Sequence, residues 1–203
     1  MRILNWRLNA LLVIYFILLI SILSGLDNTL YKEELLYAKP IVVSHTRVKG
    51  DLSIYMHQMA LRESNNTLGV VNRIGMLGKY QFSPKTLWGL GIRFKVDKNT
   101  FLSDERLQDD AMIAYLKRNR NFLSFLIFKY DGRVYNGMYI TESGLLAGAH
   151  LVGPHGLRAY FDPIYTVTVR DRIFRPRIQD SNGTKVSEYI EMFSGYDLTE
   201  LES

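Results

Sequence analysis

Hydrophobic residues are concentrated near the start of the 203-residue chain, where residues 8–26 form an apolar run without a charged side chain. A helix of about 20 such residues is long enough to cross the hydrocarbon core of a bilayer. Arg2 and Arg7 precede the run and Asp27 follows it. By the positive-inside rule, we expect the N-terminus in the cytoplasm and the residues after the run on the outer side of the membrane. We therefore predict an uncleaved transmembrane anchor over residues 1–26. A cleaved signal peptide and a buried helix of a soluble domain are the alternatives.

Beyond the anchor, residues 27–47 mix charged and apolar side chains around a Lys-Pro pair, which is typical of a tether. From residue 48 onward, apolar positions recur mainly at helical spacing, with capping residues at the expected starts. Helices are predicted from Asp51 to Ser64, from Ser83 to Gly89, from Ser103 through a stripe that includes Phe122, from Thr141 to Val152, from His155 to Phe161, and from a cap at Thr184 to near Gly195. The β-branched and aromatic residues of 162–180 predict a small hairpin or another excursion from the helices. The fold class is therefore mainly α with minor β content, as one domain over 48–203.

The amino-acid composition excludes several kinds of functional site. The absence of cysteine excludes a disulfide framework, a thiolate metal site and a catalytic thiol. The four histidines are scattered without metal-ligand spacing, so we expect neither a metal nor a cofactor. A net charge of +5 suits an anionic partner such as a cell-wall polymer or a membrane surface, and no basic stripe with interleaved aromatics indicates nucleic acid.

The most informative single position is Glu63, near the end of the first predicted helix. It shares a helical face with the apolar positions Leu52, Met56, Met59 and Ala60. A carboxyl group that is buried, and that lies at the negative end of a helix dipole, has a raised pKa and can serve as the general acid of a glycosidase. The alternative is a partly exposed glutamate that pairs with Arg62 or Arg73 at a fraying helix end.

The sequence around Glu63 resembles a known family. Glu63-Ser64 is followed by Gly78-Lys-Tyr80-Gln81 and then by Thr86 in the next helix. This order is similar to the first two motifs of the lysozyme-like lytic transglycosylases of bacterial cell walls. In that family a catalytic Glu-Ser ends a helix, a Gly-x-x-Gln segment lines the cleft, and a Thr follows in the next helix.

A third motif of that family, Ala-Tyr-Asn-Ala-Gly followed by Pro-Gly and a basic helix, is matched with changes by residues 149–158. His150 takes the place of the tyrosine and Leu151 that of the asparagine, so a hydrogen-bonding side chain near the sugar is missing or supplied differently. The resemblance covers about residues 58–197.

The resemblance implies a lysozyme-like fold and a single catalytic residue, Glu63. In the family, this glutamate protonates the oxygen between N-acetylmuramic acid and N-acetylglucosamine and then closes a 1,6-anhydro ring. The implied substrate contacts are Ser64, Gly78, Tyr80, Gln81, Thr86 and His150. For three of them the residues also allow another interpretation: a local turn for Ser64, a core aromatic for Tyr80 and a core histidine for His150.

The implied partners are peptidoglycan glycan strands and, through residues 8–26, the cytoplasmic membrane, with the domain on its outer, periplasmic side. Two other functions stay open. One is a hydrolytic lysozyme, in which Glu142 or Asp110 supplies a second carboxylate. The other is a non-catalytic wall-binding component of an envelope-spanning secretion, conjugation or phage-entry apparatus.

Overall fold

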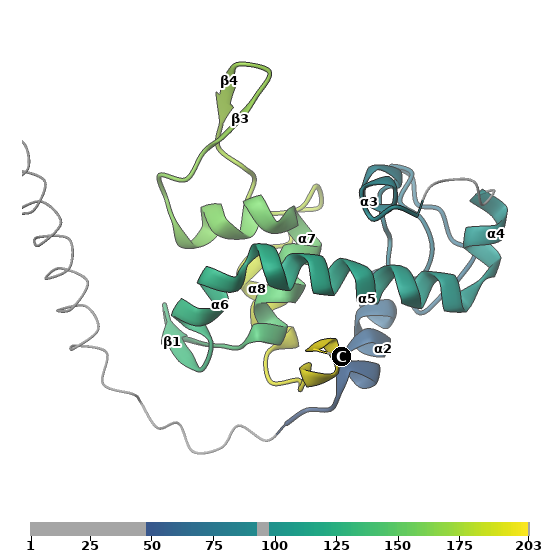
Figure 1. Cartoon of the computed structure of the whole chain (residues 1–203), viewed down its shortest axis with the longest axis horizontal. Coiled ribbons are helices and arrows are strands. Elements are labelled where there is room, and N and C mark those ends of the chain that lie inside the picture. The colour runs from purple at the N-terminus through teal and green to yellow at the C-terminus, as the bar shows by residue number, and fades with distance from the viewer. Residues whose placement is uncertain (1–47, 93–97, 203) are drawn as a thin grey trace, which may run out of the picture. The chain divides into compact units, whose positions relative to one another are not determined.

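The computed structural model describes residues 48–92 and 98–202 (Figure 1). The anchor and the tether predicted over residues 1–47 lie outside these described residues. Within the two described ranges, no helix combines the length and the hydropathy needed to span a bilayer.

Residues Ser44–Ser203 form one compact unit, a mainly helical domain with two small β-hairpins. The elements are α2 (Leu52–Ser64), α3 (Pro84–Gly89), α4 (Lys98–Ser103), α5 (Glu105–Phe122), α6 (Ser124–Tyr130), β1 (Arg133–Tyr135), β2 (Met138–Ile140), α7 (Glu142–Phe161), β3 (Val167–Val169), β4 (Arg172–Phe174), α8 (Val186–Phe193) and the 3₁₀ helix η1 (Thr199–Glu202). The mainly α class with minor β content is thus confirmed.

Four helices begin at the capping residues that the sequence predicts. The side chains of Asp51, Ser83, Asp104 and Thr141 each accept a hydrogen bond from a backbone N–H in the first turn of α2, α3, α5 and α7. The cap predicted at Thr184 is wrong. Lys185 precedes α8 without a side-chain cap, and Thr184 instead donates its N–H to Asp180 in the turn before the helix.

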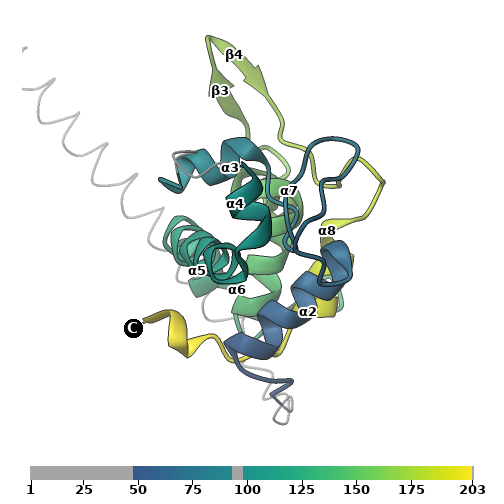
Figure 2. The same ribbon diagram turned by 90° about the vertical axis from the view of Figure 1, so that its right-hand side faces the viewer.

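Helix α7 lies between α5 and α8 and forms the centre of the core (Figure 2). Its buried side chains include Leu145, Leu146 and Ala149. Gly144 allows α8 to approach, since a Cβ there would lie 2.7 Å from the carbonyl oxygen of Ile190. The break predicted at Gly153-Pro154 is present, because Gly153 has φ 75° and ψ 161° inside the helix. The chain therefore bends within α7, and the cavity described below lies at that bend.

The two hairpins differ in their surroundings. The sequence predicts β3–β4 but not β1–β2, although Asn136-Gly137 is a strong signal for a two-residue turn. Ile140 of β2 is fully buried, whereas β4 is exposed along its length. The stripe predicted over Phe122, Leu123 and Leu126 is confirmed for the two leucines, which are buried. It is wrong for Phe122, whose side chain is 41% exposed at the end of α5.

The start and the end of the described domain are joined. Lys49 donates its N–H to the carbonyl oxygen of Gly195 over 2.8 Å, and Asp197 donates to Gly50 over 2.8 Å. Gly50 and Tyr196 form a parallel β-bridge. These bonds fix the N-terminal end of α2 against the segment that follows α8.

Candidate functional site

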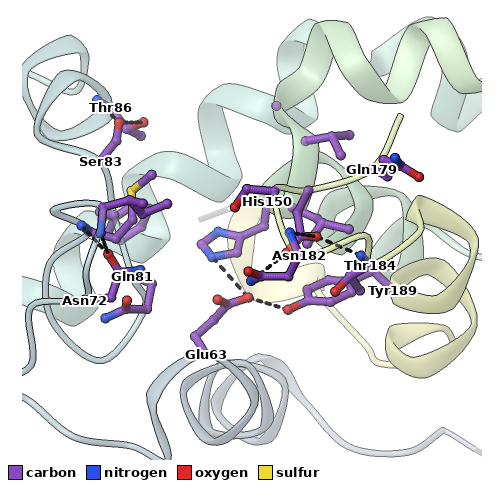
Figure 3. A pocket seen from close by; sticks show the side chains of 18 of the residues that line it. Glu63, Asn72, Gln81, Ser83, Thr86, His150, Gln179, Asn182, Thr184 and Tyr189 are labelled. Carbon is purple, nitrogen blue, oxygen red and sulfur yellow. Dashed lines mark hydrogen bonds and ion pairs between the residues drawn. The ribbon is translucent and has the colours of Figure 1, made fainter. Parts of the chain in front are cut away.

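A cavity of about 620 Å³ opens where the end of α2, the loop before α3, the bend of α7 and the segment after β4 meet (Figure 3). Its volume lies within the usual range for small-ligand sites. The lining is rich in amide and hydroxyl groups: Asn72, Gln81, Ser83, Thr86, Gln179, Ser181, Asn182 and Thr184. Such a lining suits a ligand with many hydroxyl and amide groups.

Glu63 lies at the end of α2 and points into this cavity (Figure 3). The helix stops immediately afterwards because Asn65 and Asn66 both adopt left-handed backbone angles, with φ of 55° and 58°. The Glu63 side chain is 17% exposed. Its Oε1 accepts a hydrogen bond of 2.6 Å from the hydroxyl of Tyr189. The inward position on the apolar face of the helix is therefore present.

His150 is the second neighbour of this carboxylate, with Nε2 3.8 Å from Oε1 of Glu63. Among the described residues, the Glu63 carboxylate makes its hydrogen bonds and ion pairs with Tyr189 and His150, and not with Arg62 or Arg73. Both contacts involve Oε1 and neither involves Oε2.

Tyr189 reaches the site from the buried face of α8. Burial raises the pKa of its hydroxyl far above the usual value, and the charge of Glu63 raises it further. The phenol therefore stays protonated at neutral pH and remains a hydrogen-bond donor to the carboxylate. Tyr189 is not among the predicted site residues, because it is 126 residues from Glu63 and follows no motif.

His150 is both a core residue and a lining residue of the cavity. Its side chain is 6% exposed, and its ring contacts those of Phe82 and Tyr115 edge to face, with centroids 5.6 Å away in each case. Nε2 donates a hydrogen bond of 3.0 Å to the carbonyl oxygen of Tyr80, which places the proton on that nitrogen. Nδ1 is buried and has no hydrogen-bond partner among the residues that the structure describes.

Two other predicted contacts line the cavity from the loop before α3 and from α3 itself. Gln81 has a left-handed backbone with φ 52°, and its side-chain amide donates to the carbonyl of Gly78 over 2.9 Å. The hydroxyl of Thr86 is 2.8 Å from that of Ser83, which caps the same helix. Both side chains thus have fixed positions at one side of the cavity.

The remaining predicted contacts, Ser64, Gly78 and Tyr80, are not among the lining residues. The Ser64 hydroxyl donates to the carbonyl of Lys79 over 2.8 Å, and the buried Tyr80 donates to Asp109 over 2.6 Å. Gly78 has φ 71°, and a Cβ there would lie 2.3 Å from Oε1 of Gln108. These three residues shape the segment between α2 and α3.

Lys79 and Tyr80 of that segment form a charged cluster with Glu105 and Asp109 of α5, which we call the Lys79 cluster. The Lys79 ammonium is 2.9 Å from Glu105 and 2.8 Å from Asp109. Desolvation works against the charged ammonium, but the hydrogen bonds to Asp109 and Glu105 outweigh it, and the pKa of Lys79 is raised above its usual value. Tyr80 also has a raised pKa, through burial and through its bond to Asp109.

Neither carboxylate suggested by the sequence as a second acid lies in the cavity. Glu142 forms an ion pair with Arg120, and Asp110 is exposed on α5. Burial raises the pKa of Glu142, and Arg120 opposes this shift. Asp180 is the acid that lines the cavity beside Glu63. Its Oδ1 accepts the N–H groups of Asn182 and Thr184 over 2.9 and 2.7 Å, so it stabilises a turn.

No protein-family model, curated protein or solved structure matches the chain. The function is therefore inferred from the chemistry of the cavity. Within residues 48–92 and 98–202, no three acidic or histidine side chains gather in a way that could hold a metal ion. The groups present in the cavity can move a proton at Glu63 and can hydrogen-bond a polar ligand on both sides of it.

Proposed function

We propose that the chain is a peptidoglycan lytic transglycosylase with a lysozyme-like fold, in which Glu63 is both the general acid and the base. The observation that carries this proposal is the position of Glu63. Its carboxyl group lies at a helix end, is largely buried, and points into a polar cavity with a neutral phenol as its hydrogen-bond donor. Its order with Gln81 and Thr86, both also in the lining, is the order of the family motifs.

The reaction needs one carboxyl group. Protonated Glu63 gives its proton to the oxygen between N-acetylmuramic acid and N-acetylglucosamine, and the bond from that oxygen to C1 of the muramoyl sugar breaks. The carboxylate then takes the proton of the muramoyl C6 hydroxyl while the C6 oxygen bonds to C1 and closes the anhydro ring. Glu63 is protonated again at the end of the reaction, and no water is consumed. Tyr189 holds Oε1 throughout, so that Oε2 faces the reacting oxygen.

The polar lining supports the substrate assignment. Gln81 and Thr86 on one side, and Asn182 on the other, can bind the hydroxyl and N-acetyl groups of successive sugars. Leu151 also lines the cavity, at the place where the family has an asparagine. The amide of Asn72 supplies a hydrogen-bonding group to the same cavity from a different element. With the apolar run 8–26 as an anchor, the enzyme acts at the outer face of the cytoplasmic membrane.

The test is mass spectrometry of the products from purified peptidoglycan. We expect anhydromuropeptides, which are lighter by one water than the products of hydrolysis. Glu63→Gln should lower the rate about 10³-fold, the usual contribution of a general acid. Glu191→Gln, an exposed acid on α8, is the matched control and should cleave normally.

Two outcomes would contradict the proposal. Products with reducing ends would identify a muramidase that uses water. A wild-type protein that binds wall material without cleaving it would be a component of an envelope apparatus.

A further inference from the structure

The β3–β4 hairpin projects from the helical body in both views (Figures 1 and 2). Its strands have three residues each, and it pairs as a separate two-stranded sheet. A two-stranded ribbon with no packed face is marginally stable in water. The hairpin nevertheless exposes large apolar side chains: Ile164 (86%), Val169 (52%), Ile173 (72%) and Phe174 (43%).

The apolar residues of this hairpin are interleaved with positive charge. Residues 164–178 contain four arginines and one aspartate. Arg175 is used at the base, where it donates to the carbonyl oxygens of Ala159 and Pro163. Arg170 and Arg172 lie at the tip and are exposed.

The tip is also strained. Arg170 and Asp171 are the central residues of a two-residue turn, and both have positive φ, 49° and 61°. Asparagine and glycine are the residues that favour such a turn, and a long side chain there costs free energy. Local stability therefore does not explain an arginine at position 170. Residues held in unfavourable backbone regions are typical of sites that contact a ligand.

We infer that this hairpin docks on the surface of a bilayer that contains anionic lipids. Arginine can place its guanidinium among lipid phosphates while its aliphatic stem lies along apolar surface. Ile173, which alternates with Arg172 along β4, and Ile164 at the base can then enter the boundary between headgroups and acyl chains. A wall polymer could attract the arginines, but it offers no apolar phase for the isoleucines. The combination of charge and apolar exposure therefore favours a bilayer, and it does not depend on Glu63.

The first experiment measures co-sedimentation of residues 44–203 with vesicles. This unit has its own buried core and lacks the apolar run 8–26, so any binding arises from the domain. We expect binding to vesicles that contain phosphatidylglycerol, and little binding to vesicles of phosphatidylcholine alone. Arg170→Gly should weaken binding about fivefold, the equivalent of about 1 kcal/mol for one cation near an anionic surface. Because glycine relieves the strained φ, the fold should be as stable as before, and a loss of binding cannot be due to unfolding.

A second experiment removes exposed apolar side chains. Ile173→Ser should weaken binding about tenfold, from the apolar area that no longer leaves water. Phe128→Ser is the matched control, since Phe128 is 81% exposed on α6, away from the hairpin (Figure 1). No binding to anionic vesicles, or equal losses for Ile173→Ser and Phe128→Ser, would overturn the inference. Hairpin-dependent binding to purified wall polymer in place of vesicles would overturn it as well.

A spectroscopic measurement locates the contact in the full chain. Since the protein has no cysteine, Ile173→Cys and Phe128→Cys can each be labelled at a single site with an environment-sensitive fluorophore. With the full chain reconstituted in anionic vesicles, the label at 173 should shift to shorter wavelength and be shielded from an aqueous quencher. The label at 128 should remain accessible. Equal quenching at both positions would contradict the proposed insertion.

Discussion

Two places in the domain hold a carboxylate and a tyrosine in the same way, yet they differ in charge. In the Lys79 cluster, Tyr80 donates to Asp109 over 2.6 Å. In the cavity, Tyr189 donates to Glu63 over the same distance. Burial raises the pKa of both phenols, and in each case the neighbouring carboxylate adds to the shift. The tyrosine–carboxylate pair therefore does not by itself distinguish a structural site from a reactive one.

The two sites differ in the basic side chain that lies next to the carboxylate. Asp109 has the ammonium of Lys79 at 2.8 Å, which balances its negative charge. Glu63 has His150 at 3.8 Å, and the imidazole proton on Nε2 is already donated to a carbonyl. Among the described residues, no lysine or arginine forms an ion pair with Glu63, which faces the cavity. We therefore expect changes in the Lys79 cluster to alter stability and changes around Glu63 to alter activity.

The largest expected effect on stability comes from Gly78, which precedes Lys79. In Gly78→Ala, the new Cβ would lie 2.3 Å from Oε1 of Gln108, and alanine is also strained at the positive φ of this position. The contact would displace the Gln108 side chain, which accepts a hydrogen bond from the N–H of Lys79. We expect a loss of about 3 kcal/mol in the free energy of unfolding, measured in urea. The control is Gly75→Ala, where φ is also positive but nothing lies within 4 Å. It should lose only about 1 kcal/mol, the strain alone. Equal losses would show that the contact with Gln108 does not matter.

The next effect separates the two tyrosines. Tyr189→Phe removes the donor that positions Oε1 of Glu63, which should lower kcat/KM about thirtyfold, or by about 2 kcal/mol, mainly through kcat. Tyr80→Phe removes an equivalent hydrogen bond from the Lys79 cluster. It should lower stability by about 1 kcal/mol and leave kcat/KM within about twofold. The measurement is cleavage of peptidoglycan alongside urea unfolding of each variant. Similar activities for the two variants would remove the distinction between the sites.

The smallest effect concerns pH. The pKa of Lys79 is raised above the usual 10.5, so its ion pairs stabilise the fold fully below about that value and lose this contribution as pH rises through the raised pKa. Lys79→Met should therefore cost about 1.5 kcal/mol at pH 7, discounted because both carboxylates are partly exposed. The difference from wild type should shrink at pH 11 and above. Urea unfolding at both pH values measures it, and a difference that stays constant would contradict the assignment.

The sequence predicts the features that depend on neighbouring residues. The caps of α2, α3, α5 and α7 and the bend at Gly153 follow from local chemistry, because a hydroxyl, a carboxylate or a glycine acts within one turn of its own position. The inward direction of Glu63 follows from helical periodicity in the same way. The β1–β2 hairpin is not among the predicted elements, although Asn136-Gly137 is a local signal for its turn.

The rest of the site depends on tertiary contacts that no local pattern encodes. Tyr189 and Asp180 enter the cavity from the C-terminal part of the chain, and only the packing of α8 on α7 brings them there. Ser64 and Tyr80 lie close to Glu63 and Gln81 in sequence, but their hydroxyls are hydrogen-bonded to Lys79 and Asp109. Proximity in sequence therefore predicts which residues lie in this segment. It does not predict which of their side chains point into the cavity.

The 126-residue separation between Tyr189 and Glu63 has a consequence for the order of synthesis and folding. A long-range contact of this kind forms late, since the entropy of closing a long loop must be overcome first. The bonds between Gly50 and the residues after α8 require the last part of the chain as well. A nascent or truncated chain without α8 therefore contains the acidic residue but lacks the group that orients it. On the proposed mechanism, activity therefore requires that α8 be present and packed in the domain.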